Sequence, residues 1–259
     1  MPTSTPPSDQ YVQSLARGLS VITAFDVDHP EMTLSEVADR TGLTRATARR
    51  FLHTLVQLGY VRTDGRLFTL TPQVLRLGTS YLSSLGLPEI AQPHLEALSE
   101  LLGESTSAAV LDGTDIVYVA RAATRRIMSV NINLGTRFPA FATSMGRVLL
   151  AGLDPVDLHT YFSVADLHSR EAAVAQSEKS LRAELDRVRD QGWALVDQEL
   201  EHGLRSIAAP VTSYGRVKAA INVSTAASGT ADASALVNRA LPQLQGAARA
   251  ISADLVARS

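Results

Sequence analysis

Hydrophobic residues recur at helical spacing through the first quarter of the chain. Their spacing predicts helices over residues 14–25, 33–41 and 44–58. Thr33 is followed three residues later by Glu36, which is the spacing of a capping box and predicts that the second helix begins here. A short helix, a brief turn that contains glycine and a longer helix are together typical of a helix-turn-helix.

Two strand-like runs follow the third helix, over residues 60–62 and 67–70. Asp64-Gly65 between them is a two-residue hairpin signal. Because a helix-turn-helix followed at once by a hairpin is the order of elements in a winged helix, we predict a winged helix-turn-helix over residues 10–71. The preceding residues 1–9 hold three prolines and are expected to form a disordered arm.

A further helix is predicted behind Thr71, with Pro72 at its first position. This linker segment covers residues 72–87. Its apolar residues are Val74, Leu75, Leu77, Tyr81, Leu82 and Leu85. Because they cover more than one face, the helix either meets a partner subunit or is buried between two domains of one chain.

From Pro88 to residue 259 the pattern becomes that of a mixed domain. Helices are predicted over residues 89–102, 144–151 and 232–257, and another, with Leu181, Leu185 and Val188 on its apolar face, ends at Gly192. Strands are predicted over 105–111, 116–121, 128–132, 194–196, 207–211 and 217–223, and a loop over 135–141. Most connections are hairpin-like or cross one helix, which favours a mainly antiparallel sheet with helices outside. The fold class is therefore α+β.

The absence of cysteine narrows the possible chemistry. It excludes a disulfide framework, a thiolate metal site and a cysteine nucleophile. No apolar run approaches the ~18 residues that a membrane-spanning helix requires, and the first ten residues lack the features of a signal peptide. The six histidines do not have the spacing of a metal site. We expect a cytoplasmic protein with no membrane association, metal or cofactor.

Positive charge is concentrated in one part of the chain. Between Arg40 and Arg76 there are seven arginines and one acid, Asp64, a formal +6, so that the rest of the chain carries −8 of the total −2. Such a basic window in an acidic protein suggests a surface for a polyanion. The alternative is an arginine-rich face that only contacts solvent.

The third predicted helix has residues of opposite character on its two faces. Ala48, Leu52 and Leu55 share the inward face, and most of the arginines lie outward. Arginine can donate two hydrogen bonds to guanine, whereas arginines beside a wing tip suit a phosphate or the minor groove. The candidate DNA-binding residues are Thr44, Arg45, Thr47, Arg49, Arg50, Arg62 and Arg66. The pattern leaves open which arginine reads a base.

Several stretches of the chain resemble the IclR family of bacterial transcriptional regulators. They are residues 13–19, 43–52, 142–151 and 196–211. Residues 137–146 are most similar to the branch that regulates protocatechuate, β-ketoadipate and hydroxybenzoate catabolism. The resemblance implies a winged helix, a linker helix used in dimerisation and a GAF-like α/β domain that binds a small acid. It also implies assembly as a homodimer or a dimer of dimers.

The helix predicted to begin at Ser144 offers a place for a carboxylate. Its first backbone N–H groups lack intrahelical acceptors, and the positive end of its dipole points the same way. The preceding loop carries Arg137, whose guanidinium could converge on the same carboxylate. Thr143 or Ser144 could equally act only as the helix cap, which is the commoner role of such residues.

The family resemblance implies further contacts with the effector. These are Ser144, Met145, Gly146, Leu204, Ser206, Asn222 and Ser224. Asp197 alternates onto one face with Glu199 and Glu201, and it is a candidate for accepting a hydrogen bond from a ligand hydroxyl. Asn222 and Ser224 alternate with apolar residues, so they could instead form only the solvated face of a strand.

These observations favour a DNA-binding regulator of aromatic-acid catabolism that responds to an acid of the protocatechuate, 4-hydroxybenzoate or β-ketoadipate class. The alternatives are a family member that regulates another carbon source, an enzyme with a GAF-like domain, and an architectural DNA binder. The sequence has no Gly-x-Ser-x-Gly, Walker-type or Gly-x-Gly-x-x-Gly motif, so we do not expect an enzyme. Sequence-indifferent binding with strong salt dependence would mark an architectural protein.

Overall fold

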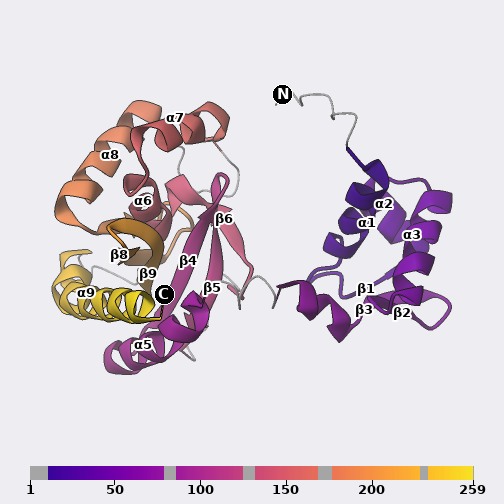
Figure 1. Cartoon of the computed structure of the whole chain (residues 1–259), viewed down its shortest axis with the longest axis horizontal. Helices are drawn as coiled ribbons and strands as arrows, with labels where there is room; N and C mark the ends of the chain where they lie inside the picture. The colour runs from indigo at the N-terminus through magenta and orange to yellow at the C-terminus, as the bar shows by residue number, and fades with distance from the viewer. Residues whose placement is uncertain (1–10, 79–85, 125–131, 169–176, 228–232, 259) are drawn as a thin grey trace. The chain divides into compact units, whose positions relative to one another are not determined.

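The computed structural model describes residues 11–78, 86–124, 132–168, 177–227 and 233–258. The chain forms two compact units, residues 1–81 and 82–259 (Figure 1). The arm expected over residues 1–9 lies outside the described part of the chain.

The N-terminal unit contains the three predicted helices. They are α1 (Gln13–Thr23), α2 (Leu34–Thr41) and α3 (Arg45–Gln57). The capping box at the start of α2 is present, because the N–H of Thr33 donates to Glu36 Oε2 (2.7 Å) and the N–H of Glu36 donates to Thr33 Oγ1 (3.4 Å). Gly42, at φ 65°, ends α2 in the left-handed conformation that glycine adopts without strain. These caps set the turn between α2 and α3.

A three-stranded antiparallel sheet completes this unit. Its order is β1-β3-β2, with β1 (Glu31–Thr33), β2 (Val61–Thr63) and β3 (Leu67–Leu70). The strand β1 was not predicted, because it has only three residues and its last residue also caps α2. The wing loop has three residues rather than two, since the Asp64 carboxylate accepts the N–H groups of Arg66 (2.8 Å) and Leu67 (2.7 Å).

The predicted linker helix is described only in part. Pro72–Val74 (η1) is a 3-10 turn, capped by Thr71, whose side chain accepts the N–H of Gln73 at 3.2 Å. Residues 75–78 continue as α-helix, whereas residues 79–85 lie outside the described part of the chain. The next helix, α5, begins at Leu87, two residues earlier than predicted.

The C-terminal unit is built on a six-stranded sheet with the order β6-β5-β4-β9-β8-β7. The strands are β4 (Ser105–Asp112), β5 (Asp115–Ala122), β6 (Arg137–Pro139), β7 (Ala194–Asp197), β8 (Leu204–Ser213) and β9 (Arg216–Ala226). Every neighbouring pair is antiparallel, which confirms the predicted sheet type. The loop predicted over 135–141 is wrong, because Arg137–Pro139 pairs with β5. The strand predicted at 128–132 falls mostly on undescribed residues.

Helices cover both faces of this sheet (Figure 1). One face packs against α5 (Leu87–Leu102) and α9 (Ala233–Ala257). The other packs against η2 (Ala140–Ala142), α6 (Ser144–Ala151), α7 (Pro155–Val164) and α8 (Glu178–Gln191). The helix α7 was not predicted, because it buries only Leu158 and Tyr161 and so shows little periodicity. The helix α6 is buried along its whole length, which places it between the sheet and α8.

Among the described residues, no helix combines the length and the apolar character that crossing a membrane requires.

Candidate functional site

The recognition helix α3 has the two faces that its sequence predicts. Ala48 and Leu52 are fully buried and Leu55 nearly so, in a core with Val21, Met32, Val37 and Val61. The side chains of Arg45, Arg49 and Arg50 are exposed. Packing of the inward face therefore holds the three arginines on the outer surface of the N-terminal unit.

The first turn of α3 is fixed by its own side chains. Thr44 caps the helix by accepting the N–H of Thr47 (3.3 Å), and the two hydroxyls lie 2.9 Å apart. Arg45 donates to the hydroxyl of Ser35 on α2. Thr44 and Arg45 thus have structural roles within the helix-turn-helix, whereas Arg49 and Arg50 extend from the middle of α3.

A basic groove between α1 and α3 adds a residue that the sequence analysis missed. Arg17 and Arg50 line it, together with Gln13, Ser14, Thr47, Phe51 and Thr54. Two guanidinium groups facing one groove favour an anion between them, such as a backbone phosphate. Arg17 was missed because it lies before the basic window of residues 40–76. On the wing, Arg62 on β2 and Arg66 at the tip are both exposed.

The C-terminal unit contains a pocket between α6 and the sheet. Its lining residues are Tyr118, Ala142, Thr143, Ser144, Val196, Leu200, Leu204, Ser206, Asn222 and Ser224. Five of the predicted effector residues are therefore brought together, although they come from α6, β8 and β9. The other five lining residues, Tyr118, Ala142, Thr143, Val196 and Leu200, were not predicted.

Polar atoms gather on one wall of this pocket. The hydroxyls of Ser144 and Ser206 are 2.8 Å apart, and Asn222 Nδ2 donates to Ser224 Oγ at 3.0 Å. The buried Oδ1 of Asn222 has no hydrogen-bond partner among the described residues. A buried acceptor without a partner costs about 1–3 kcal/mol, so this oxygen is suited to a ligand hydroxyl.

The N-terminus of α6 forms another side of the pocket. Thr143 is the cap, since its Oγ1 accepts the N–H of Gly146 (3.0 Å), and Ser144 is the first helical residue. The N–H groups at the start of an α-helix have no intrahelical acceptor, and only one of them is satisfied by this cap. Thr143 therefore acts as the helix cap, and both Thr143 and Ser144 line the pocket.

Tyr118 of β5 lines the same pocket. Burial raises the pKa of its hydroxyl to about 12, partly opposed by the positive charge of Arg121. Its ring packs edge-to-face against Phe138, with the centroids 5.9 Å apart. Tyr118 is therefore neutral near pH 7, and a neutral hydroxyl can donate to a ligand oxygen.

Arg137 is not at this pocket, contrary to the predicted convergence on a carboxylate. It lies on the edge strand β6, where Nη1 is 2.6 Å from Asp112 Oδ2 and Nε is 3.1 Å from Asp115 Oδ2. Its hydrogen bonds, first of all with Asp112, raise the pKa of the guanidinium above its usual value. These partners lie at the β4–β5 turn, which pairs with β6 but is remote in sequence, so the sequence pattern could not reveal them.

Three further predicted contacts are not among the lining residues of the pocket. Met145 is buried in the core between α6 and α8. At Gly146 an added Cβ would lie 2.1 Å from the carbonyl oxygen of Ala140, so only glycine lets α6 approach η2 this closely. Asp197 Oδ2 accepts from Arg205 Nη2 at 2.8 Å, whereas its buried Oδ1 has no hydrogen-bond partner among the described residues.

A buried arginine anchors the loop between β7 and β8, which covers the pocket. Arg147 on α6 is 2% exposed; its Nε donates to the carbonyl oxygen of Phe141 (2.9 Å), and its two terminal nitrogens lie 3.0 and 2.5 Å from the carboxylate oxygens of Glu199. This bidentate pair anchors the β7–β8 loop, whose Leu200 lines the pocket. The sequence analysis placed Glu199 only on an alternating acidic face and missed its partner.

The pocket is nearly closed in this structure, with a cavity volume of about 10 Å³. Sites for drug-sized ligands usually measure ~300–1,000 Å³. A ligand must therefore displace part of the lining to enter. Leu200, in the β7–β8 loop, is one of the apolar side chains that close the pocket, and Gln198 in the same loop has a left-handed φ of 61°.

Comparison with known proteins places both units in one family. Residues 14–65 match the IclR helix-turn-helix domain, and residues 79–253 match the bacterial transcriptional regulator IclR C-terminal domain. The chain is 48% identical to the Pca regulon regulatory protein of Pseudomonas putida over 92% of this chain and 82% of that protein.

Two solved structures are also similar. A protein from Rhodococcus sp. RHA1 is 52% identical, with a TM-score of 0.84 and coverage of 96% of this chain and 100% of that one. An IclR homologue from Microbacterium hydrocarbonoxydans, complexed with 4-hydroxybenzoate, is 26% identical, with a TM-score of 0.82 and coverage of 94% and 99%. On the strength of both domain matches, the chain belongs to the IclR family of transcriptional regulators.

Proposed function

We propose that this regulator controls genes of aromatic-acid catabolism and that its effector is a small hydroxylated aromatic carboxylate, of the protocatechuate or 4-hydroxybenzoate class. The observation that carries the proposal is the pocket at the N-terminus of α6. The pocket is lined by a helix N-terminus, by two serine hydroxyls 2.8 Å apart and by an unpartnered acceptor, Asn222 Oδ1. Such a pocket can bind a carboxylate at one end and a hydroxyl at the other.

The relatives support this class of effector. The Pseudomonas putida protein is named for the Pca regulon, and the Microbacterium hydrocarbonoxydans structure holds 4-hydroxybenzoate. β-Ketoadipate also has carboxylates that can bind at the helix N-terminus, but it has no hydroxyl group that could donate to Asn222 Oδ1.

Membership of a family of transcriptional regulators, rather than any missing motif, supports the expectation that the chain is not an enzyme.

Replacement of Ser144 by Asp tests the carboxylate seat. The fixed negative charge at the first turn of α6 would take the place of the ligand carboxylate, so calorimetry should show at least about tenfold weaker binding of 4-hydroxybenzoate, ~1.4 kcal/mol. Ser180→Asp, at the exposed first turn of α8, adds the same charge away from the pocket and should leave the affinity unchanged. Unchanged affinity in Ser144→Asp, with operator binding intact, would contradict the seat.

For DNA, we propose that α3 reads the operator, with Arg49 and Arg50 as the central residues and Arg45, Thr44, Thr47, Arg62, Arg66 and Arg17 as supporting contacts. Both are exposed: Arg50 lies on the face opposite the buried Leu52, and Arg49 lies on the flank of that face. An arginine that reads a base contributes about 1–3 kcal/mol of discrimination, whereas one that holds a phosphate acts on all sequences alike.

Arg49→Ala and Arg50→Ala should therefore weaken binding to an operator selected from random DNA by the wild-type protein. The expected loss is about 1–3 kcal/mol for a base-reading arginine, with a much smaller loss on unrelated DNA. Fluorescence anisotropy at a fixed salt concentration measures both. Arg216→Ala, an exposed arginine at the start of β9, is the matched control. If both α3 variants bind like wild type, α3 is not the recognition element.

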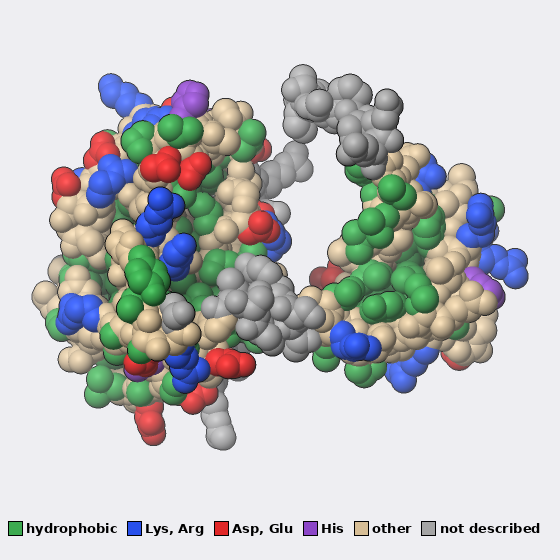
Figure 2. All heavy atoms as spheres, viewed as in Figure 1, with side chains coloured by type: hydrophobic (Ala, Val, Ile, Leu, Met, Phe, Trp, Pro, Cys, Tyr) green, Lys and Arg blue, Asp and Glu red, His purple; other side chains and the backbone are tan. Residues whose placement is uncertain are grey.

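We further propose that the protein acts as a homodimer or a dimer of dimers. Figure 2 shows hydrophobic side chains gathered on one face of the N-terminal unit. Tyr11, Val12, Leu15 and Leu19, in and before α1, and Leu75 and Leu77 after the wing are all about half exposed or more. Exposed apolar groups in such number are typical of a protein interface, and dimers bind repeated half-sites.

Sedimentation velocity measures the oligomeric state directly. The wild-type protein should sediment as a dimer or larger at micromolar concentration, and Leu15→Glu combined with Leu19→Glu should shift it toward monomer, because the two charges would be buried at the interface. Arg258→Glu, which changes an exposed residue after α9, controls for the change in charge. A wild-type monomer, with and without DNA, would overturn the proposal.

A further inference from the structure

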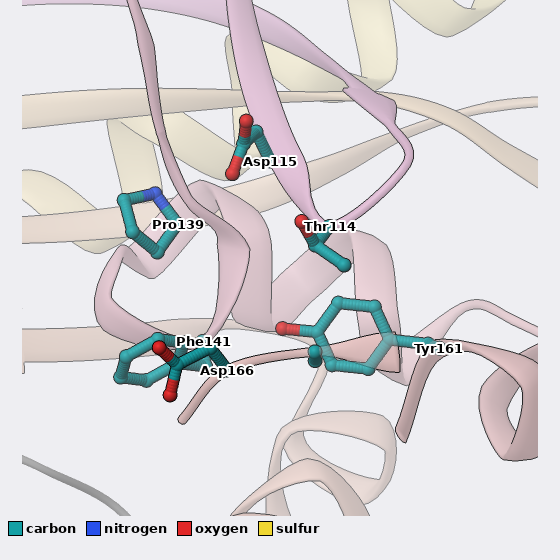
Figure 3. A pocket seen from close by; sticks show the side chains of 7 residues that line it. Thr114, Asp115, Pro139, Phe141, Tyr161 and Asp166 are labelled. Atoms are coloured by element: carbon teal, nitrogen blue, oxygen red, sulfur yellow. The ribbon is translucent and has the colours of Figure 1, made fainter. Parts of the chain in front are cut away.

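A second pocket lies on the C-terminal unit, and like the proposed effector pocket it borders the η2 turn. Its lining residues are Thr114, Asp115, Pro139, Phe141, Tyr161, Ala165 and Asp166 (Figure 3). They come from the β4–β5 turn, from β6 and η2, and from α7 and the residues after it. Phe141 of η2 lines this pocket, whereas the neighbouring Ala142 lines the effector pocket. The two pockets therefore share one turn but no lining residue.

The hydroxyl of Tyr161 is the feature that points to a ligand. Its side chain is 4% exposed, and among the described residues no acceptor receives the hydroxyl proton. Figure 3 shows this hydroxyl pointing between Thr114 and Phe141, into the pocket. Burial raises the pKa of Tyr161, partly opposed by the backbone N–H of Phe141, which is directed at the phenol oxygen, so the hydroxyl keeps its proton and can act as a donor. A buried hydroxyl proton without an acceptor is costly unless something binds to it.

The charged residues of the lining are both acidic. Asp166 is exposed, with Oδ1 accepting the N–H of His168 at 3.0 Å, and Asp115 is half-buried. Arg137 donates to Asp115 and also to Asp112, and within the described part of the chain it makes no hydrogen bond or ion pair with Asp166. The two carboxylates of the lining, with Asp112 beside them, outnumber the one guanidinium that contacts them, and this excess of negative charge favours a cation.

The shape and walls of the pocket narrow the class of cation. The cavity volume is about 110 Å³. This is below the ~300–1,000 Å³ of sites for drug-sized ligands, so the pocket suits a small molecule. Pro139, Phe141 and Ala165 provide apolar walls that suit methylene groups. A divalent metal ion is disfavoured, because calcium takes six to eight oxygen ligands and magnesium requires near-ideal octahedral geometry, whereas one of the two carboxylates here already binds Arg137.

We propose that this pocket is a second small-molecule site, which binds a compact organic cation carrying a neutral oxygen, of the amino-alcohol class. The ammonium group lies against Asp115 and Asp166, and the methylene groups pack on Phe141 and Pro139. The neutral oxygen accepts the hydrogen bond of the Tyr161 hydroxyl. A ligand bound there contacts the η2 turn, which also forms a wall of the effector pocket.

Three probes of similar size separate the two recognition elements. Ethanolamine carries both the charge and the oxygen, 1-propylamine lacks the oxygen, and 1-propanol lacks the charge. Ligand-observed NMR titrations on the full-length protein should show saturable binding of ethanolamine, weaker binding of 1-propylamine and none of 1-propanol. Equal binding of the two amines, or no saturable binding of ethanolamine, would overturn the proposal.

Two variants locate the binding. Tyr161→Phe removes only the unpartnered hydroxyl, so the fold should be unaffected, while ethanolamine binding should weaken about two- to tenfold and 1-propylamine binding should not change. Asp166→Asn should weaken the binding of both amines about two- to fivefold.

Two further variants are controls. Asp190→Asn, at the exposed end of α8, removes one charge elsewhere and should have no effect on binding. Ser206→Ala, in the effector pocket, should also leave ethanolamine binding unchanged. If Tyr161→Phe and Asp166→Asn both bind ethanolamine like wild type, the cation binds elsewhere and the proposal fails.

Discussion

The close approach of α6 to the η2 turn is the constraint on which the C-terminal unit depends. Gly146 permits the contact with Ala140, and Arg147, on the next position of the helix, is buried with its guanidinium between the carbonyl of Phe141 and the carboxylate of Glu199. A buried charge that loses its partner destabilises a protein by about 3–5 kcal/mol, so this arrangement strongly favours one position of the helix. That position fixes where the N-terminus of α6 meets β8 and β9, and hence where the effector pocket lies.

The same interaction links the pocket to the segment that covers it. Glu199 belongs to the loop between β7 and β8, and Leu200 of that loop lines a cavity of only about 10 Å³. An effector of aromatic size must therefore bind a conformation in which this cover has moved. A ligand shifts a conformational equilibrium by its difference in affinity for the two states. The closed pocket thus gives a physical basis for a response to the effector, because the bound and free states cannot have the same loop position.

Local signals in the sequence predicted much of this structure. The capping box at Thr33 and Glu36, the cap at Thr44 and the apolar face of α3 follow from spacing over a few residues, and each is present. Ser144, Ser206 and Asn222, which the family resemblance implied as effector contacts, line one pocket. The ion pairs that the sequence analysis did not predict depend on contacts between distant segments. Arg137 pairs with Asp112 and Asp115 across a strand pairing, and Arg147 pairs with Glu199 more than fifty residues away. No periodicity within one segment encodes such partners.

The central claim is that the effector carboxylate binds at the N-terminus of α6 and not at Arg137. Titration of isotope-labelled protein with 4-hydroxybenzoate, followed by the backbone amide resonances, tests it most directly. The account predicts the largest shifts at Ser144 and Met145 and at Ser206 on β8, together with a change at Leu200 as the loop moves. It predicts little change at Asp112, Asp115 and Arg137. Large shifts at that edge, with the α6 amides unmoved, would contradict it.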